Sequence, residues 1–145
     1  MTGRVLAVDP GEKRIGLAIS DETATLARGL LVLKHKSLME DCQMIINIAV
    51  ENNVDRIIVG VPETDDGEER PQTRHAQKIV TTLCELTSKP IILWDESDST
   101  RMARSVRLES GARRKTRSGH LDAVAAAIIL QSWLDWKKIE DDQNA

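Results

Sequence analysis

The sequence predicts an α/β protein built on a five-stranded mixed sheet with helices on both faces. Short apolar runs typical of buried strands recur along the chain, and from residue 37 onward they alternate with segments of helical spacing. The first three runs follow one another closely, which predicts an antiparallel meander. Strands that alternate with helices imply right-handed parallel crossovers, so parallel strands should extend the meander into one sheet.

The opening hairpin, Val5–Asp21, predicts two apolar strands joined by a tight glycine turn. Asp9 ends the first strand, where an acid is costly to bury unless it pairs with a cation or holds a metal. Gly11 lets the backbone approach whatever Asp9 holds. Lys13 or Arg14 offers a simple ion pair, so the hairpin by itself fits an ion pair as well as a functional site.

The other elements follow in order along the chain. A third strand is expected within Ala27–Lys36, and Ser37 with Glu40 three residues later matches a capping box that starts a helix. Asn52-Asn53 supplies the end of that helix. The remaining prediction is a strand at 54–62, a helix from about 73 to 86, a strand at 91–94, a helix between 97 and 111, and an apolar last helix from 121 to about 136.

The 145 residues suffice for one domain, which we expect over residues 1–138, with 139–145 as a frayed tail. Cys42 and Cys84 fall on the apolar stripes of expected helices and are interpreted as core thiols in a reducing compartment. Trp133 is expected in the core rather than stacked on a base. The sequence shows no signal segment and no long apolar run, so we expect a cytoplasmic protein with no membrane partner.

The charge is distributed unevenly, although the net charge is only −3. The segment 101–117 carries seven arginines and lysines against a single acid, Glu109. Such a local basic segment is a candidate contact for phosphates, because counterion release depends on the patch rather than on the total charge. A solvated helix face and loop is the alternative interpretation.

Three acids that are remote along the chain are expected to converge: Asp9, Glu96 and Asp122. Parallel strands present their carboxyl ends at one edge of a sheet, and a helix packed on the sheet can point its first turn at that edge. Three carboxylates in one place repel each other unless a divalent cation screens them. Oxygen ligands without a His or Cys cluster favour Mg²⁺ or Mn²⁺, and such a site suits phosphoryl transfer to an activated water.

Each acid also has a structural interpretation. Asp122 can simply stabilise a helix dipole from the first turn. Only one of Asp95 and Glu96 needs to point inward, because side chains alternate along a strand, and Asp98 suits a helix N-cap. His120 can act as a general base or a ligand, but a lone histidine at a helix start is more often structural.

Four linked motifs run along nearly the whole chain, from about Arg4 to Asp135. They are VDPGEKRIGLAISD at Val8–Asp21, DRIIVGVP with the later Asp66-Gly67, DE followed by Ser99-Thr100, and the closing RRKTRSGHLDAVAAAIILQSWLD. Together they resemble the YqgF/RuvX family of small bacterial RNase H-like proteins. Members of that family are regarded as nucleases that process the 5′ end of pre-16S rRNA, and they are related to Holliday junction resolvases. The resemblance implies an RNase H-like fold, a carboxylate site of Asp9, Glu96 and Asp122, and dependence on Mg²⁺ or Mn²⁺.

The sequence departs from the family pattern at three positions. Ser97-Asp98 stands where relatives commonly have an Arg-Leu pair, which removes an arginine for local substrate contact or carboxylate pairing. Related resolvases carry a fourth acid one helical turn before the last, whereas Gly119 stands three residues before Asp122. A fourth ligand must then come from elsewhere or from water. Pro10 replaces the more usual small or apolar residue after Asp9.

The leading hypothesis is a metal-dependent endonuclease that acts on structured RNA during ribosome assembly. Asp9, Glu96 and Asp122 would hold the metals. The cations that would assist at the scissile phosphate or guide the phosphate backbone are Lys13, Arg14, Arg113, Arg114, Lys115 and Arg117.

Three alternatives remain open at this point. A junction-resolving deoxyribonuclease acting on branched DNA would need two active sites and hence a dimer. A non-catalytic RNA-binding assembly factor would bind RNA without turnover. An actin-like ATPase is disfavoured, because the chain is short and has no Gly-x-x-x-x-Gly-Lys-Ser/Thr loop. A monomer or a weak homodimer is expected.

Overall fold

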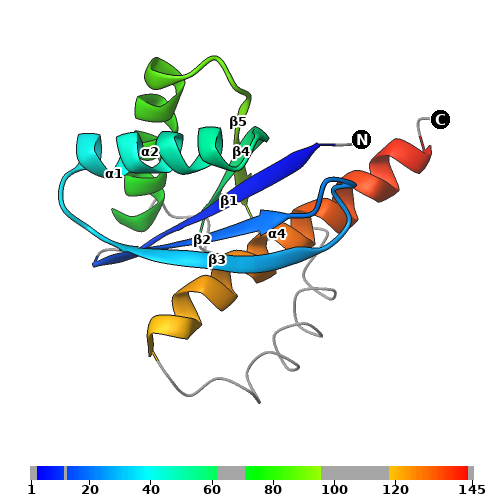
Figure 1. Ribbon diagram of the computed structural model, residues 1–145, viewed down its shortest axis with the longest axis horizontal. Coiled ribbons are helices and arrows are strands. Elements are labelled where there is room, and N and C mark those ends of the chain that lie inside the picture. Colours follow the sequence, from blue (N-terminus) through cyan, green and yellow to red (C-terminus); the bar gives the residue numbers. More distant parts are fainter. Residues whose placement is uncertain (1–2, 12, 62–70, 96–117, 144–145) are drawn as a thin grey trace.

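The structure is a computed structural model that describes residues 3–11, 13–61, 71–95 and 118–143 (Figure 1). The helix predicted between 97 and 111 lies outside these ranges. The predicted strands and the other predicted helices are confirmed. The elements are β1 (Arg4–Pro10), β2 (Arg14–Ser20), β3 (Ala27–Lys34), α1 (Leu38–Glu51), β4 (Val54–Val61), α2 (Pro71–Leu86), β5 (Ile91–Asp95) and α4 (Ser118–Gln143).

The strands form one mixed sheet in the order β3-β2-β1-β4-β5, which confirms the predicted fold class. The central strand β1 pairs antiparallel with β2 and parallel with β4, and β4 pairs parallel with β5. The meander continues from β2 into β3. The carboxyl ends of β1, β4 and β5 therefore share one edge of the sheet, which we call the carboxyl edge. The opposite edge is the amino edge.

The helix α1 begins and ends where its sequence predicts. The Ser37 side chain accepts a hydrogen bond of 3.2 Å from the backbone N–H of Glu40, which satisfies a donor of the first turn. The Asn52 backbone N–H donates to the Ile48 carbonyl at the other end, and Asn53 takes a left-handed φ of 56°. These caps fix the lengths of both connections, so α1 packs back onto the sheet (Figure 1).

One face of the sheet is covered by α1 and α2, and we call it the α1/α2 face (Figure 1). Large aliphatic side chains from β1 and β2 meet the apolar sides of both helices there. Leu6 and Val8 of β1 are fully buried in this layer, as are Ile45 of α1 and Leu83 of α2. Burial of a side chain of this size stabilises the fold by about 1.5–3 kcal/mol, so this layer is the main hydrophobic core.

Of the helices that the structure describes, only α4 covers the other face, and we call it the α4 face (Figure 1). The strands present small residues to the helix here, among them Ala7 and Ala18. At Gly60 an added Cβ would lie 2.7 Å from Ile129 Cδ1, and at Gly29 it would lie 3.1 Å from Ala123 Cβ. The small side chains let α4 approach the backbone of the sheet closely.

Polar contacts fasten α4 to strands at both sides of the sheet. Gln131 is buried, its Oε1 accepts from the Ala27 backbone N–H at 2.9 Å, and its Nε2 donates to the Thr25 carbonyl at 2.9 Å. On the β5 side, Trp94 Nε1 donates to Ser132 Oγ at 3.0 Å. Each contact satisfies groups that would be costly to leave unpaired, so the helix has one defined position.

Two details differ from the sequence prediction. The helix α4 runs from Ser118 to Gln143, so it starts earlier than residue 121 and continues into the predicted tail. Cys84 is exposed, so its interpretation as a core residue was wrong. Cys42 is buried as predicted, and burial raises the pKa of its thiol to about 11. Trp133 is buried in the α4 layer, as predicted.

Candidate functional site

Asp9 lies at the carboxyl edge of the central strand and faces α4. It is the last residue but one of β1 and pairs with Gly16 of β2. Because side chains alternate, Asp9 shares the α4 face with Ala7, whereas Val8 belongs to the other layer. The Asp9 side chain is half-buried. A strand that is fully buried on both faces thus ends in a carboxylate that solvent can still reach.

The turn after Asp9 requires glycine. A Cβ added to Gly11 would lie 2.3 Å from the Arg14 carbonyl oxygen, a distance that no side chain tolerates. The turn brings the chain back into β2 with Arg14 as the first residue, and Ile15 belongs to the α1/α2 layer. Alternation therefore places Arg14 on the α4 face, diagonally across from Asp9 and within reach of a long side chain. Lys13 is exposed in the turn.

Asp95 ends β5 at the same edge, but its side chain faces the other way. Ile92 and Trp94 belong to the α4 layer, so alternation directs Asp95 to the α1/α2 side. Asp95 pairs with Val61, the last residue of β4. The structure thus separates Asp95 from the face of Asp9. Glu96, the predicted site acid, lies outside the described residues.

The first turns of α4 lie over the meander on the face of Asp9. Ala123 contacts the part of β3 around Gly29, which pairs with Ala18, and Ala18 pairs with Ala7. This row lies two residues from Asp9 along β1. Asp122 immediately precedes Ala123 in the helix, although its side chain lies outside the described part of the structure. Figure 1 shows α4 beginning at the end of the sheet where β1 turns into β2.

The predicted basic segment is not described by the structure. Arg113, Arg114, Lys115 and Arg117 all lie outside the described residues, as does the side chain of His120. Among the described residues, no three His, Cys, Asp or Glu side chains gather as metal ligands. The one site acid with a described side chain, Asp9, is an accessible carboxylate, and carboxylate oxygens are the donor type that Mg²⁺ and Mn²⁺ prefer. The donor type therefore fits such an ion.

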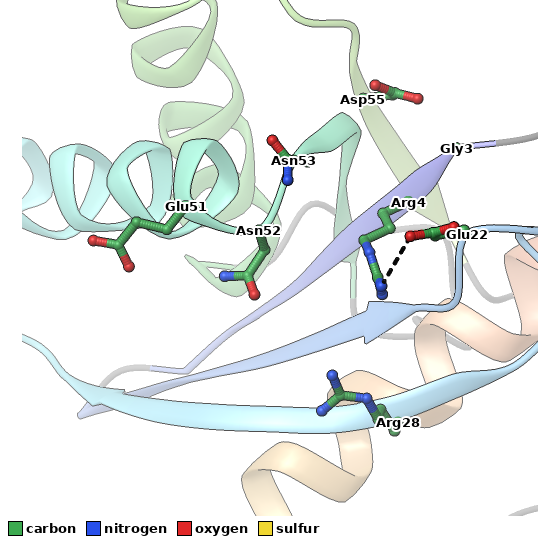
Figure 2. A pocket seen from close by; sticks show the side chains of 8 residues that line it. All are labelled: Gly3, Arg4, Glu22, Arg28, Glu51, Asn52, Asn53 and Asp55. Atoms are coloured by element: carbon green, nitrogen blue, oxygen red, sulfur yellow. Dashed lines mark ion pairs between the residues drawn. The ribbon is translucent and has the colours of Figure 1, made fainter.

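A hollow of about 560 Å³ lies at the amino edge, and the predicted site residues with described side chains do not line it (Figure 2). Its charges partly neutralise each other. Arg4 forms an ion pair of 3.6 Å with Glu22 and donates a hydrogen bond of 3.1 Å to the Ser20 carbonyl. Gly3 has a φ of 100°, a conformation that other residues rarely adopt, and the Asp55 carboxylate lies beside it. These contacts stabilise the sheet at its amino edge.

The amino edge also holds a self-contained turn between β2 and β3. The Asp21 carboxylate accepts hydrogen bonds from the backbone N–H groups of Thr25 (2.8 Å) and Leu26 (3.2 Å) and from the Thr23 hydroxyl (2.7 Å). The bond from Thr25 is the largest cause that holds the pKa of Asp21 below its usual range. The Asp21 carboxylate therefore stabilises the turn between β2 and β3.

The tryptophans of the described residues have structural contacts. The rings of Trp94 and Trp136 lie 5.2 Å apart between centroids, and both pack on the α4 layer with the buried Trp133. Within the described ranges, none of the helices combines the length and apolar composition that crossing a lipid bilayer requires.

Proteins of similar sequence match this chain over nearly its whole length. The chain is similar to a protein of Thermoanaerobacter pseudethanolicus, with 40% identity over 136 residues that cover 93% of this chain and 98% of the relative. A protein of Caldanaerobacter subterraneus subsp. tengcongensis is 38% identical over 140 residues, covering 93% of this chain and 98% of the relative. Both relatives bear the name of a pre-16S rRNA nuclease, given as a proposed activity.

Solved structures show the same fold at much lower identity. Thermus thermophilus RuvC in complex with a Holliday junction substrate matches with a TM-score of 0.57 and 15% identity over 92% of this chain and 96% of that one. The yeast mitochondrial Holliday junction resolvase Ydc2 matches with a TM-score of 0.60 and 14% identity over 94% and 80%. The fold is therefore RNase H-like, of the RuvC type.

A family model described as RuvX, Holliday junction resolvase, matches residues 3–136. The match spans the central strand with Asp9 and reaches through most of α4. Together with relatives of about 40% identity over nearly the whole length, it shows that the chain belongs to the RuvX family.

Proposed function

We propose that this protein is a metal-dependent endonuclease of the bacterial cytoplasm that cleaves structured RNA and processes the 5′ end of pre-16S rRNA. The observation that carries the proposal is the position of Asp9. It is a half-buried carboxylate at the carboxyl edge of the central strand, on the face that α4 covers. The names of the relatives supply the substrate class. We expect one domain over residues 1–138, acting as a monomer or a weak homodimer.

Asp9, Glu96 and Asp122 are proposed to hold Mg²⁺ or Mn²⁺. Asp9 would supply the central ligand, and the first turns of α4, which include Asp122, lie over the same face of the sheet. Asp95 faces away from Asp9, so the acid after β5 is assigned to Glu96, which lies outside the described residues. Bound divalent ions would supply an activated water and stabilise the charge on the leaving oxygen.

The chain's own cations would orient the RNA. Arg14 lies on the face of Asp9 and is near enough to contact the phosphate next to the cleaved bond, and Lys13 is exposed in the same turn. Binding of the longer backbone is assigned to the basic segment that contains Arg113, Arg114, Lys115 and Arg117.

The test compares cleavage of a precursor rRNA fragment in Mg²⁺ by the wild type, Asp9→Asn and Asp95→Asn. Asp9→Asn should lower the rate by more than about 100-fold, since changes one shell beyond a metal ligand already cost 10–100-fold. Asp95→Asn is the matched control, an acid at the same edge that faces away, and should cleave like the wild type. Equal rates for Asp9→Asn and the wild type would exclude the site.

A junction-resolving deoxyribonuclease is the second candidate. The description of the family model and the fold shared with a resolvase bound to a Holliday junction favour it. A four-way DNA junction incubated with the same variants distinguishes the two. Symmetric cutting needs paired active sites, so a protein that remains strictly monomeric with the junction would exclude resolution. RNA binding without metal-dependent cleavage would instead support a non-catalytic assembly factor.

A further inference from the structure

We propose that Asp41 is a positioning residue, which acts through the connection between β3 and α1 to fix the backbone in front of Arg14. The inference rests on the proposed function for the role of Arg14, which is to contact the phosphate next to the cleaved bond. It goes beyond that proposal, because Asp41 belongs to the first turn of α1 and lies outside the residues assigned to the site. The Asp41 side chain is only 4% exposed.

The bonds of the Asp41 carboxylate leave its own helix. Its Oδ1 accepts from the Lys36 backbone N–H at 3.0 Å, and its Oδ2 pairs with Nδ1 of His35. The first turn of α1 does not need this carboxylate as a cap, because the Ser37 side chain accepts from the Glu40 N–H. A favourable interaction with the helix dipole would require neither bond. The carboxylate therefore fixes the two residues that precede the helix cap.

His35 transmits this constraint to the turn that follows β1. Its backbone N–H donates to the Lys13 carbonyl at 2.9 Å. That carbonyl belongs to the planar peptide group that joins Lys13 to Arg14, so the bond orients the peptide from which Arg14 starts. Lys34, the residue before His35, pairs directly with Arg14 in the sheet. The connection held by Asp41 thus extends the pairing of β2 and β3 to the peptide in front of Arg14.

The two ends of this series of contacts lie on opposite faces of the sheet. On the α1/α2 face, His35 contacts Asp41 of α1, and its ring meets that of His75 of α2 edge-on with centroids 6.4 Å apart. Arg14 lies on the α4 face, which also carries the proposed catalytic acid. The coupling between the faces therefore passes through the backbone, at the bond from His35 to the Lys13 carbonyl.

The hydrogen bond that orients the His35 ring comes from Asp41. His75 Nε2 is buried and has no hydrogen-bond partner among the described residues, so this nitrogen does not hold the ring. Without the Asp41 carboxylate, the Lys36 N–H and the His35 ring would both lose a partner. Polar groups that lose a partner are costly to keep from water, so the connection should relax toward solvent and away from Lys13.

The experiment measures kcat and KM for cleavage of the precursor rRNA fragment in Mg²⁺. Asp41→Ala should lower kcat about tenfold, since a misplacement of about 1 Å can cost about 100-fold. KM should change by less than about threefold, because binding of the longer backbone is assigned to the basic segment. Asp41→Asn keeps an oxygen that accepts from the Lys36 N–H, and it should restore kcat to within about threefold of the wild type.

A double-mutant cycle separates positioning from general damage. In an Arg14→Gln background, Asp41→Ala should lower kcat by less than about twofold, because the side chain that Asp41 positions is already gone. The matched control is Asp21→Ala at the amino edge, which removes another carboxylate that accepts from backbone N–H groups of a turn. It should leave kcat and KM unchanged. Wild-type kcat in folded Asp41→Ala, the same loss in both backgrounds, or an equal loss in the control would overturn the proposal.

Amide hydrogen exchange measured by NMR examines the connection independently of cleavage. Exchange of the N–H at residue 35 should accelerate about tenfold in Asp41→Ala and stay unchanged in Asp21→Ala. Thermal unfolding monitored by circular dichroism checks that the variants fold. If Asp41→Ala does not fold, His35→Ala carries the same expectations, because that side chain is already 36% exposed. Unchanged exchange in a folded variant would overturn the proposal, whereas failure of the proposed function appears separately, as unchanged cleavage by Asp9→Asn.

Discussion

The two faces of the sheet are packed differently, and adjacent residues of β1 show the difference. Leu6 points into the α1/α2 layer, where large aliphatic side chains fill the space between sheet and helices. Ala7 points into the α4 layer, where small residues let one helix approach the backbone. Asp9 follows on the second face. The first face supplies most of the hydrophobic stabilisation, and the second places the first turns of α4 over the face that carries Asp9.

The contrast suggests why the acid lies where it does. Large side chains around Asp9 would separate it from α4, whereas a row of alanine and glycine residues holds the helix near. The face with less apolar area to bury is therefore the one on which side chains from remote segments can meet. Substitutions on the two faces should then affect stability and activity in different proportions.

Leu6→Ala should have the largest effect on stability. Leu6 is fully buried, and truncation leaves a cavity in a closely packed layer, so the free energy of unfolding should fall by about 2–5 kcal/mol. Urea unfolding measures the change, and Val50→Ala on the exposed side of α1 is the control, expected within about 0.5 kcal/mol. Cleavage per folded molecule should remain near that of the wild type. A loss of cleavage per folded molecule would contradict this division of roles between the α1/α2 face and the α4 face.

Ala7→Leu should destabilise the fold less than Leu6→Ala does, but it should lower RNA cleavage more. Ala7 is fully buried, and its cluster includes Ala126 and Leu130 of α4. The larger side chain has no space, so we expect a loss of about 1–3 kcal/mol and a displaced helix. RNA cleavage per folded molecule should fall more than in Leu6→Ala, because the helix carries Asp122. If the two variants retain equal specific activity, the position of α4 does not matter for catalysis.

Asp21→Asn should have the smallest effect and should depend on pH. Asp21 lies at the amino edge, and its folded-state pKa is lowered chiefly by the hydrogen bond from Thr25. A lowered pKa means that the ionised form contributes stability above the unfolded value of 3.8, and that this contribution disappears as the pH falls through the folded value. Thermal unfolding should separate the wild type from the variant at pH 7 but not near pH 2. A difference that persists in acid would assign the effect to something other than the charge.

Much of the fold follows from local patterns in the sequence. The apolar runs of β1, β4 and β5 and the capping box at Ser37 predict their elements because burial and backbone hydrogen bonds are decided within a few residues. Periodicity cannot say how far a helix continues once its apolar pattern ends, so the extension of α4 to Gln143 was not predicted. The exposure of Cys84 was missed because an apolar stripe does not show how far a neighbouring element covers it.

The candidate site is predicted less completely. Asp9 is singled out by the sequence because a charge at the end of an apolar strand is costly. The orientation of Asp95 away from Asp9 depends on the register of β5 against β4, which short-range patterns do not contain.

The contact of Gln131 with Thr25 and Ala27 joins segments more than a hundred positions apart. Because a polypeptide is synthesised from its amino terminus, the meander leaves the ribosome long before the helix that covers it. In the nascent chain, Ala7 and Ala18 therefore stay uncovered by α4 until translation is almost finished. The α4 face, on which Asp9 lies, is consequently the last part of the described fold to be completed.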